Sequence, residues 1–135
     1  MKRSLLFFLL GWALVGCGGG NSGSDVTITL AGTVTQGATS GGQGNPAPSA
    51  VVTINETHQS ATITSANNGT YSIGSVPVGG TFTVQVTEPN NALINVSCGI
   101  RIPDSTTIQV TSSPDVCSAG TSPAIGTLIL NITLP

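Results

Sequence analysis

Residues 26–35 read VTITLAGTVT, and they carry the clearest indication of fold class in the chain. Apolar residues or glycine stand at the even positions, and threonine or alanine stands between them. Successive side chains of a β-strand point to opposite faces, so this period of two predicts a half-buried strand with a threonine-rich outer face. The same alternation returns at the other end, at Leu128, Leu130, Ile132 and Leu134.

Further strands are expected at short intervals between these two. The segments with strand-like composition are residues 50–55, 61–65, 70–73, 81–87, 93–102 and 106–111. Threonine and valine are frequent in them, and both favour strands because branching at Cβ packs well on a pleated surface. The segment 93–102 is expected to break at Cys98 and Gly99. No segment after Cys17 shows a helical period.

Glycine, proline and asparagine separate these segments. Residues 36–49 (QGATSGGQGNPAPS) predict a loop, and turns are expected at 56–60, 67–69 (NNG) and 76–80 (VPVGG). About seven short strands with frequent turns predict an all-β fold, a single β-sandwich of two packed sheets over residues 26–135. A length of 135 residues also allows no more than one such domain with a tail.

The N-terminus has the organisation of a secretory signal. Lys2 and Arg3 precede an uncharged, mostly apolar run at residues 5–15 (LLFFLLGWALV). As a helix this run would rise about 16 Å, whereas the apolar core of a bilayer is about 30 Å thick. The segment therefore predicts a signal peptide rather than a stable membrane span.

Leu14, Val15, Gly16 and Cys17 follow, and they resemble the processing site of bacterial lipoproteins. The resemblance implies that the signal peptide, residues 1–16, is removed, that the Cys17 thiol carries a diacylglycerol, and that its new amine is acylated, for example with palmitate. Two or three acyl chains hold a protein at a membrane stably, whereas one does so only marginally. The alternative is an ordinary cleaved signal with a chance cysteine. Gly18, where that family uses aspartate for inner-membrane retention, favours the outer membrane.

Removal of the signal changes the composition. Residues 17–25 begin with the cysteine and continue as GGGNSGSD, which predicts a flexible tether. Arg101 becomes the one basic residue against five carboxylates, so the net charge becomes −4. So little positive charge excludes a nucleic-acid-binding surface, which needs several Lys or Arg to neutralise phosphates.

The other two cysteines are expected to form a disulfide. Cys98 and Cys117 remain once Cys17 carries lipid, and the compartment outside the cytoplasm favours oxidation. The rival interpretation is a metal or redox site. No CxxC spacing is present, and two thiolates with the single His58 fall short of four zinc ligands. We therefore expect no metal and no cofactor.

The segments 50–55 (AVVTIN), 62–73 (TITSANNGTYSI) and 76–86 (VPVGGTFTVQV) resemble the carboxypeptidase regulatory-like domain. The resemblance covers residues 26 to 90 and implies a transthyretin-like (prealbumin-like) β-sandwich. Tyr71 and Phe82 match the two aromatic positions of its motifs, and Gly69 with Gly79 or Gly80 match its turn glycines. The cysteine pair is not part of the family pattern. These are folding motifs, so they indicate a fold more than a function.

Candidate catalytic residues are few. His58 is the only histidine, and Glu56 lies two positions before it, so on a strand they would face one side and could form a metal pair or an acid–base dyad. They fall in an expected turn, and one histidine with one glutamate is not a catalytic constellation, so a solvated turn is favoured. The remaining metal alternative is calcium, although no calcium-loop motif is present. Its ligands would come from the carboxylates Asp25, Glu56, Glu88, Asp104 and Asp115.

Three classes of function remain open. The favoured one is a non-enzymatic, lipid-anchored cell-envelope protein, structural or partner-binding, that uses a sheet edge or loops, for example by strand addition. The second is a carbohydrate-binding module at the cell surface, which needs exposed aromatic platforms, whereas Tyr71 and Phe82 are expected to be buried. The third is an enzyme, which is disfavoured because the sequence shows no set of catalytic residues. The expected partners are the membrane and an envelope protein or glycan, and not nucleic acid.

Overall fold

The computed structural model describes residues 25–37 and 44–135. The expected signal peptide (1–16), the lipidation site Cys17 and nearly all of the expected tether (17–25) lie outside the described residues. The expected loop at 36–49 is described only at its two ends.

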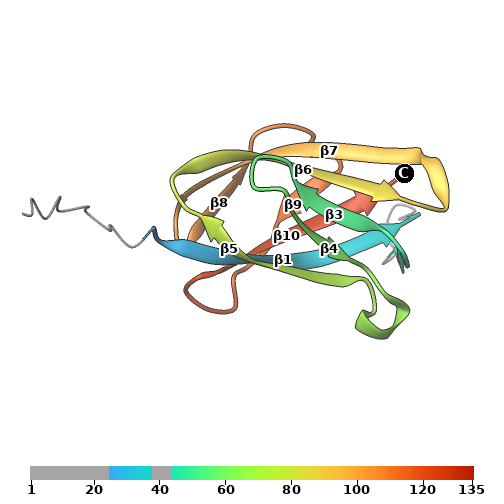
Figure 1. Ribbon diagram of the computed structural model, residues 1–135, viewed down its shortest axis with the longest axis horizontal. Helices are drawn as coiled ribbons and strands as arrows, with labels where there is room; N and C mark the ends of the chain where they lie inside the picture. Colours follow the sequence, from blue (N-terminus) through green and yellow to red (C-terminus); the bar gives the residue numbers. More distant parts are fainter. Residues whose placement is uncertain (1–24, 38–43) are drawn as a thin grey trace, which may run out of the picture.

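The described residues form ten β-strands and one short 3-10 helix. In chain order these are β1 (Thr27–Gln36), β2 (Asn45–Pro46), β3 (Val51–Ile54), β4 (Gln59–Thr62), η1 (Ser65–Asn67), β5 (Thr70–Pro77), β6 (Gly80–Glu88), β7 (Asn91–Asp104), β8 (Thr107–Val110), β9 (Cys117–Ala119) and β10 (Thr127–Leu134). The all-β prediction is confirmed, and the short strands β2 and β9 are the two that no predicted segment covers (Figure 1).

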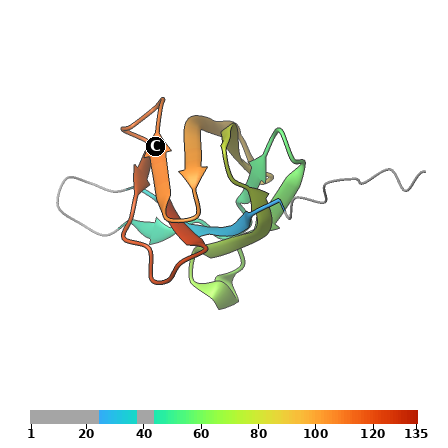
Figure 2. The same ribbon diagram turned by 90° about the vertical axis from the view of Figure 1, so that its left-hand side faces the viewer.

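The strands are divided between two five-stranded sheets. One has the order β2-β1-β10-β9, with β5 paired to β1, and the other has the order β4-β3-β6-β7-β8. The first and last long strands, β1 and β10, run parallel, whereas the other strand pairs are antiparallel. Viewed from the end at which β1 begins, the strands surround a common interior (Figure 2).

The inward face of each long strand is apolar, as the period of two predicts. Along β10, every second residue from Leu128 to Leu134 is buried. Residues of both sheets meet in one hydrophobic cluster, which includes Leu30, Val52, Ile100 and Leu130. Two sheets that share a single apolar interior fit the predicted β-sandwich.

A disulfide joins Cys98 to Cys117, with 6.3 Å between their Cα atoms, and confirms the predicted pairing. Cys98 lies on β7 and Cys117 on β9, so the bond connects one sheet to the other. Both residues are buried at 1–2% exposure. The covalent link therefore closes the side of the sandwich on which β8 and β9 are neighbours.

Three expected boundaries were wrong. The break expected at Cys98 and Gly99 is absent, because β7 is continuous from Asn91 to Asp104 and Gly99 pairs with Thr83. The return strand expected at 61–65 lies at β4, Gln59–Thr62, because β4 is set by its register against β3. The turn expected at 76–80 is shorter, since β5 continues to Pro77 and β6 starts at Gly80.

A side chain crosses from β5 to β10 at the middle of β1. The parallel register pairs Ala31 with Ile129 and Val34 with Ile132, and it is interrupted between these pairs. Gly32 lies in the interruption, opposite Tyr71 on β5. A Cβ on Gly32 would overlap the Leu130 carbonyl and lie 3.2 Å from the Tyr71 ring. Glycine at this position therefore lets the Tyr71 ring pass over β1 and reach β10.

Candidate functional site

The two sides of the sandwich differ in how they are closed. On one side, the disulfide links β7 to β9. On the other, β4 is the last strand of its sheet and β5 pairs only with β1 among the described residues. One side-chain hydrogen bond crosses here, from Gln59 Nε2 to the Gly74 carbonyl at 2.8 Å. We call the space between β4 and residues 70–74 the β4–β5 seam.

The β4 edge presents backbone groups to the seam. Ile63, directly after β4, donates to the Ala50 carbonyl at 2.7 Å and accepts from the Ser49 amide at 2.9 Å, so its backbone groups face β3. Along an antiparallel strand, the backbone groups of alternate residues point to opposite sides. The amides and carbonyls of Thr62 and Ser60 therefore point away from β3, towards the seam.

The edge of β5, in the other sheet, also presents backbone groups to the seam. The Gly69 carbonyl accepts from the Val34 amide at 2.8 Å and so faces β1, whereas the Gly74 carbonyl faces Gln59 across the seam. By the same alternation, the backbone groups of Thr70 and Ser72 point into the seam with Gly74. An unpaired edge of this kind is a template for another strand.

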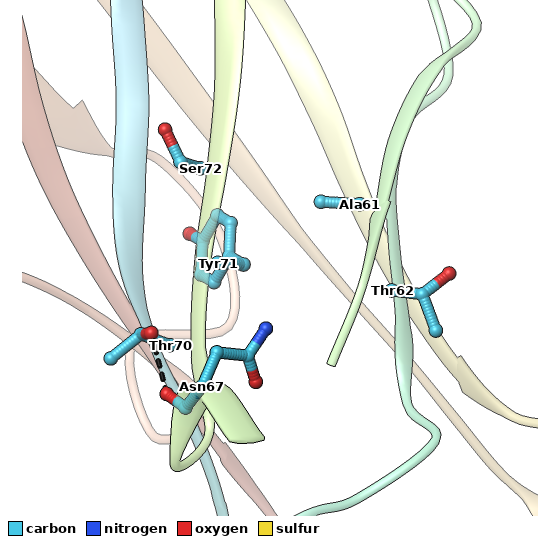
Figure 3. Close-up of a pocket in the computed structure, with 6 residues that line it drawn as sticks. All are labelled: Ala61, Thr62, Asn67, Thr70, Tyr71 and Ser72. Carbon is cyan, nitrogen blue, oxygen red and sulfur yellow. Dashed lines mark hydrogen bonds between the residues drawn. The ribbon is translucent and has the colours of Figure 1, made fainter. Parts of the chain in front are cut away.

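A hollow of about 360 Å³ lies between the two edges. It is lined by Ala61, Thr62, Asn67, Thr70, Tyr71 and Ser72. Figure 3 shows Ala61 and Thr62 on the β4 side of the hollow, and Thr70, Tyr71 and Ser72 on the β5 side. The lining contains no charged side chain, so the hollow offers hydroxyl, amide and backbone groups to a neutral ligand.

The end of the seam is built by a capped turn. The Asn67 side-chain oxygen accepts from the Thr64 amide at 2.8 Å, and the Thr70 hydroxyl donates to the Asn67 carbonyl at 2.6 Å. Asn68 (φ 51°) and Gly69 (φ 81°) then adopt the left-handed conformation, which confirms the turn predicted at 67–69. These two hydrogen bonds and the left-handed pair close the turn between β4 and β5.

Glu56 and His58 lie in the turn between β3 and β4, as predicted. Both Glu56 carboxylate oxygens accept from the Thr83 amide, at 2.9 and 2.8 Å. Partial burial alone raises the pKa of Glu56, but the hydrogen bonds, the one from the Thr83 backbone foremost, outweigh it and hold the pKa below its ordinary value. His58 is exposed with φ 58°. The carboxylate therefore binds the Thr83 amide of β6 just beyond the last β3–β6 pair, Ile54 with Val84.

The other carboxylates are dispersed. Among residues 25–37 and 44–135, no group of three or more His, Cys, Asp or Glu residues could hold a metal ion. Asp104 accepts from the Thr106 hydroxyl at 2.7 Å and from its amide at 2.8 Å, and these bonds lower the Asp104 pKa. The calcium alternative thus finds no cluster of ligands in the described part of the chain.

Aromatic platforms for sugar stacking are also missing from the described residues. Tyr71 and Phe82 are both 5% exposed, as predicted. The Tyr71 hydroxyl is turned inward and donates to the Leu130 carbonyl at 2.7 Å. Burial raises the pKa of Tyr71 above its ordinary value. Tyr71 contributes only to the wall of the seam hollow and offers no open face to a ring.

The seam itself could not be located from the sequence. Alternation identifies which residues face inward, but it does not say that two consecutive strands join different sheets. The one local signal was the NNG turn, which marks a reversal between β4 and β5 without showing that they remain unpaired.

Comparison with known proteins identifies no relative: no family model, no curated protein and no solved structure matches the chain. In residues 25–37 and 44–135, no helical segment has the length and hydropathy that a membrane span requires.

Proposed function

We propose that this protein is a non-enzymatic, lipid-anchored component of the bacterial cell envelope that binds an extended segment of an envelope partner along the β4–β5 seam. The observation that carries the proposal is the pair of unpaired strand edges at Ser60 and Thr62 on one side and at Thr70 and Ser72 on the other. The lipid anchor would hold this domain at the membrane surface, and the seam would supply the contact.

The anchor rests on the sequence. A basic start, an apolar run at residues 5–15 and a small residue before Cys17 make up the pattern of a lipoprotein signal. We propose that Cys17 becomes the acylated first residue, and Gly18 after it favours the outer membrane. The disulfide supports placement outside the cytoplasm, because such bonds persist in oxidising compartments.

We also propose that the sandwich is of the transthyretin-like type found in the carboxypeptidase regulatory-like domain. Tyr71 and Phe82, which match the aromatic positions of that family, are both buried. Gly69 (φ 81°) and Gly79 (φ 84°), which match its turn glycines, both have positive φ. These features support the resemblance at the positions that carry it.

Strand addition fits the seam for a chemical reason. An extended peptide offers alternating N–H and C=O groups, which are the partners that the Thr70 and Ser72 backbone groups require. The small side chains along the edges, Ala61 and Ser72 among them, leave room for a backbone to approach. A neutral lining neither selects nor repels a charged partner, so main-chain hydrogen bonds would supply the affinity.

The anchor is tested by labelling cells with a palmitate analogue. The wild-type protein is expected to incorporate the label and to fractionate with the outer membrane, and Cys17→Ser is expected to lose both. Label that persists in Cys17→Ser would remove the anchor from the proposal.

The seam is tested by photocrosslinking in intact cells. A photoreactive amino acid at Thr62 is expected to give a discrete adduct, whereas the same group at Gln109, exposed on the β8 edge, gives none. Ser72→Pro removes the outward amide of β5, and edge strands tolerate proline at such positions. The adduct is expected to disappear in Ser72→Pro and to persist in the matched Ser72→Ala, which keeps the amide.

Unfolding curves of the Ser72 variants establish that both remain folded. An adduct that survives Ser72→Pro in a folded protein, or one that forms at Gln109 and not at Thr62, would contradict strand addition at the seam.

A further inference from the structure

Three large apolar side chains are strongly exposed among the described residues. They are Val26 (55%), Leu93 (94%) and Ile125 (84%). Val26 directly precedes β1, and Ile125 precedes Gly126, which is bonded to Thr29 near the start of β1. Leu93 is the third residue of β7, next to the β6–β7 hairpin, and this hairpin lies at the end of the molecule opposite to the start of β1 (Figure 1). One end therefore carries two exposed apolar side chains, and the opposite end carries one.

Backbone hydrogen bonds hold the first end together. The Val26 carbonyl accepts from the Val78 amide at 3.0 Å, which fixes the start of β1 against the turn before β6. Gly126, the neighbour of Ile125, accepts from the Thr29 amide at 2.7 Å and donates to the Ser105 carbonyl at 3.1 Å. The segments that carry Val26 and Ile125 are thus fixed by backbone hydrogen bonds to their neighbours in the fold.

The loop that carries Ile125 is apolar or neutral throughout. Residues 120–126 read GTSPAIG, and Pro123 and Ala124 in it are exposed together with Ile125. A hollow of about 380 Å³ lies here, lined by Thr106, Ser122, Ala124 and Ile125. The nearby acidic residues are Asp25 and Asp104, and the Asp104 carboxylate already accepts a hydrogen bond from the Thr106 hydroxyl.

We infer that this end, formed by residues 25–26, 78–79, 105–106 and 120–126, rests on the lipid bilayer and places Ile125 and Val26 among the headgroups. The inference rests on the proposed acylation of Cys17. Apolar side chains at the end of an already anchored domain gain free energy by leaving water at the interface. The two acids favour a zwitterionic surface over an anionic one.

The length of the chain between the lipid and the domain restricts the orientation. Cys17 lies eight residues before Asp25, and a fully extended chain of that length spans at most about 29 Å. Leu93 and Asp104 are eleven residues apart on β7, which corresponds to about 35 Å along the strand. An inverted domain, with Leu93 at the bilayer, would hold Asp25 about 35 Å from Leu93, farther than the extended chain spans. The length of the chain therefore favours the end that carries Val26 and Ile125 over the end that carries Leu93.

This orientation leaves the seam accessible. The turn that closes the seam hollow, η1, lies away from the end where β1 begins (Figure 1). A partner could therefore add a strand at the seam while the other end remains on the membrane.

Tryptophan substitution tests the orientation in the full-length, acylated protein. Trp12 lies in the expected signal peptide, so a tryptophan introduced at Ile125 would be the only one in the mature chain. The protein is reconstituted into phosphatidylcholine vesicles with brominated acyl chains. Ile125→Trp is expected to show blue-shifted emission and several-fold stronger quenching than the matched Leu93→Trp, which replaces an even more exposed side chain at the opposite end.

Equal quenching at the two positions, or quenching only at position 93, would overturn the inference. Mass spectrometry of the same samples separates this failure from that of the proposed function. A protein that carries acyl chains on Cys17 but shows no quenching at position 125 overturns the orientation alone, whereas a protein without acyl chains overturns the anchor and the orientation together.

Discussion

The Tyr71 hydroxyl on β5 donates a 2.7 Å hydrogen bond to the Leu130 carbonyl on β10, across the intervening strand β1. The bond occupies a gap in the parallel β1–β10 ladder, which is interrupted between its Ala31 and Val34 pairs. On the same stretch of β1, the Asn131 side-chain oxygen accepts from the Thr33 amide at 3.2 Å and from its hydroxyl at 3.1 Å. Side chains thus replace main-chain pairing where Gly32 stands.

Tyr71→Phe is expected to lower the free energy of unfolding by about 1–2 kcal/mol. The substitution keeps the ring but leaves the buried Leu130 carbonyl without its donor, and an unsatisfied buried acceptor costs about this amount. Urea unfolding of the soluble domain measures the change. A stability equal to that of the wild type would mean that the bond contributes nothing.

Alkaline pH is expected to destabilise the wild type through the same residue. Burial raises the pKa of Tyr71 in the folded state above its ordinary value of 10.0. Below pH 10 the stabilisation is therefore fully present, and it is lost as the pH rises further, because the unfolded chain ionises first. Tyr71→Phe should lack this part of the alkaline loss. Thermal unfolding between pH 9 and 11 compares the two proteins.

Gly32→Ala is expected to destabilise the domain by at least about 2 kcal/mol. The added Cβ would overlap the Leu130 carbonyl, which is backbone and cannot rotate away. Gly74→Ala is the matched control on β5, since its Cβ would meet nothing within 4 Å, and it should change stability by no more than about 0.5 kcal/mol. Similar losses in the two variants would show that the close approach at Gly32 is unimportant.

Removal of the disulfide through the double variant Cys98→Ala/Cys117→Ala is expected to cost about 3 kcal/mol. The two cysteines are 19 residues apart, and closing a loop of this length restricts the unfolded chain by about that amount. Chemical denaturation with and without reductant provides the measurement. Native, non-reduced protein should expose no reactive thiol, and free thiols at both positions would rule out the bond.

Glu56→Gln is expected to lower stability at neutral pH by less than about 1 kcal/mol, because the side chain is exposed. The lowered pKa means that the carboxylate stabilises the fold above its ordinary pKa of 4.5, and that this contribution is lost as the pH falls through the folded-state pKa. The two proteins should therefore converge in acid. His58→Gln, in the same turn, is the control and should behave as the wild type.

Local alternation predicted the inward faces well because burial requires only that every second side chain be apolar. Residues 26–35 and 128–134 correspond closely to β1 and β10, and Tyr71 and Phe82 are buried as expected. Gly99 was misread as a break. The Gly99 amide donates to the Ser112 hydroxyl at 2.7 Å, so the missing side chain admits a neighbouring segment instead of ending β7.

The short strands β2 and β9 were missed for a related reason. Strands of two and three residues carry no period, and they exist only because a longer strand offers them an edge. Asn131, which bonds to Thr33, likewise has a role that depends on a residue 98 positions away.

The all-β class, the buried faces, the NNG turn and the cysteine pair could be predicted from the chain alone, since each depends on the chemistry of neighbouring residues or on simple counting. Three features became known only from the folded molecule: β4 and β5 belong to different sheets, β1 and β10 pair in parallel, and Val26 and Ile125 share one end. These features depend on contacts between distant segments, which are selected by the packing of the whole core and leave no local pattern.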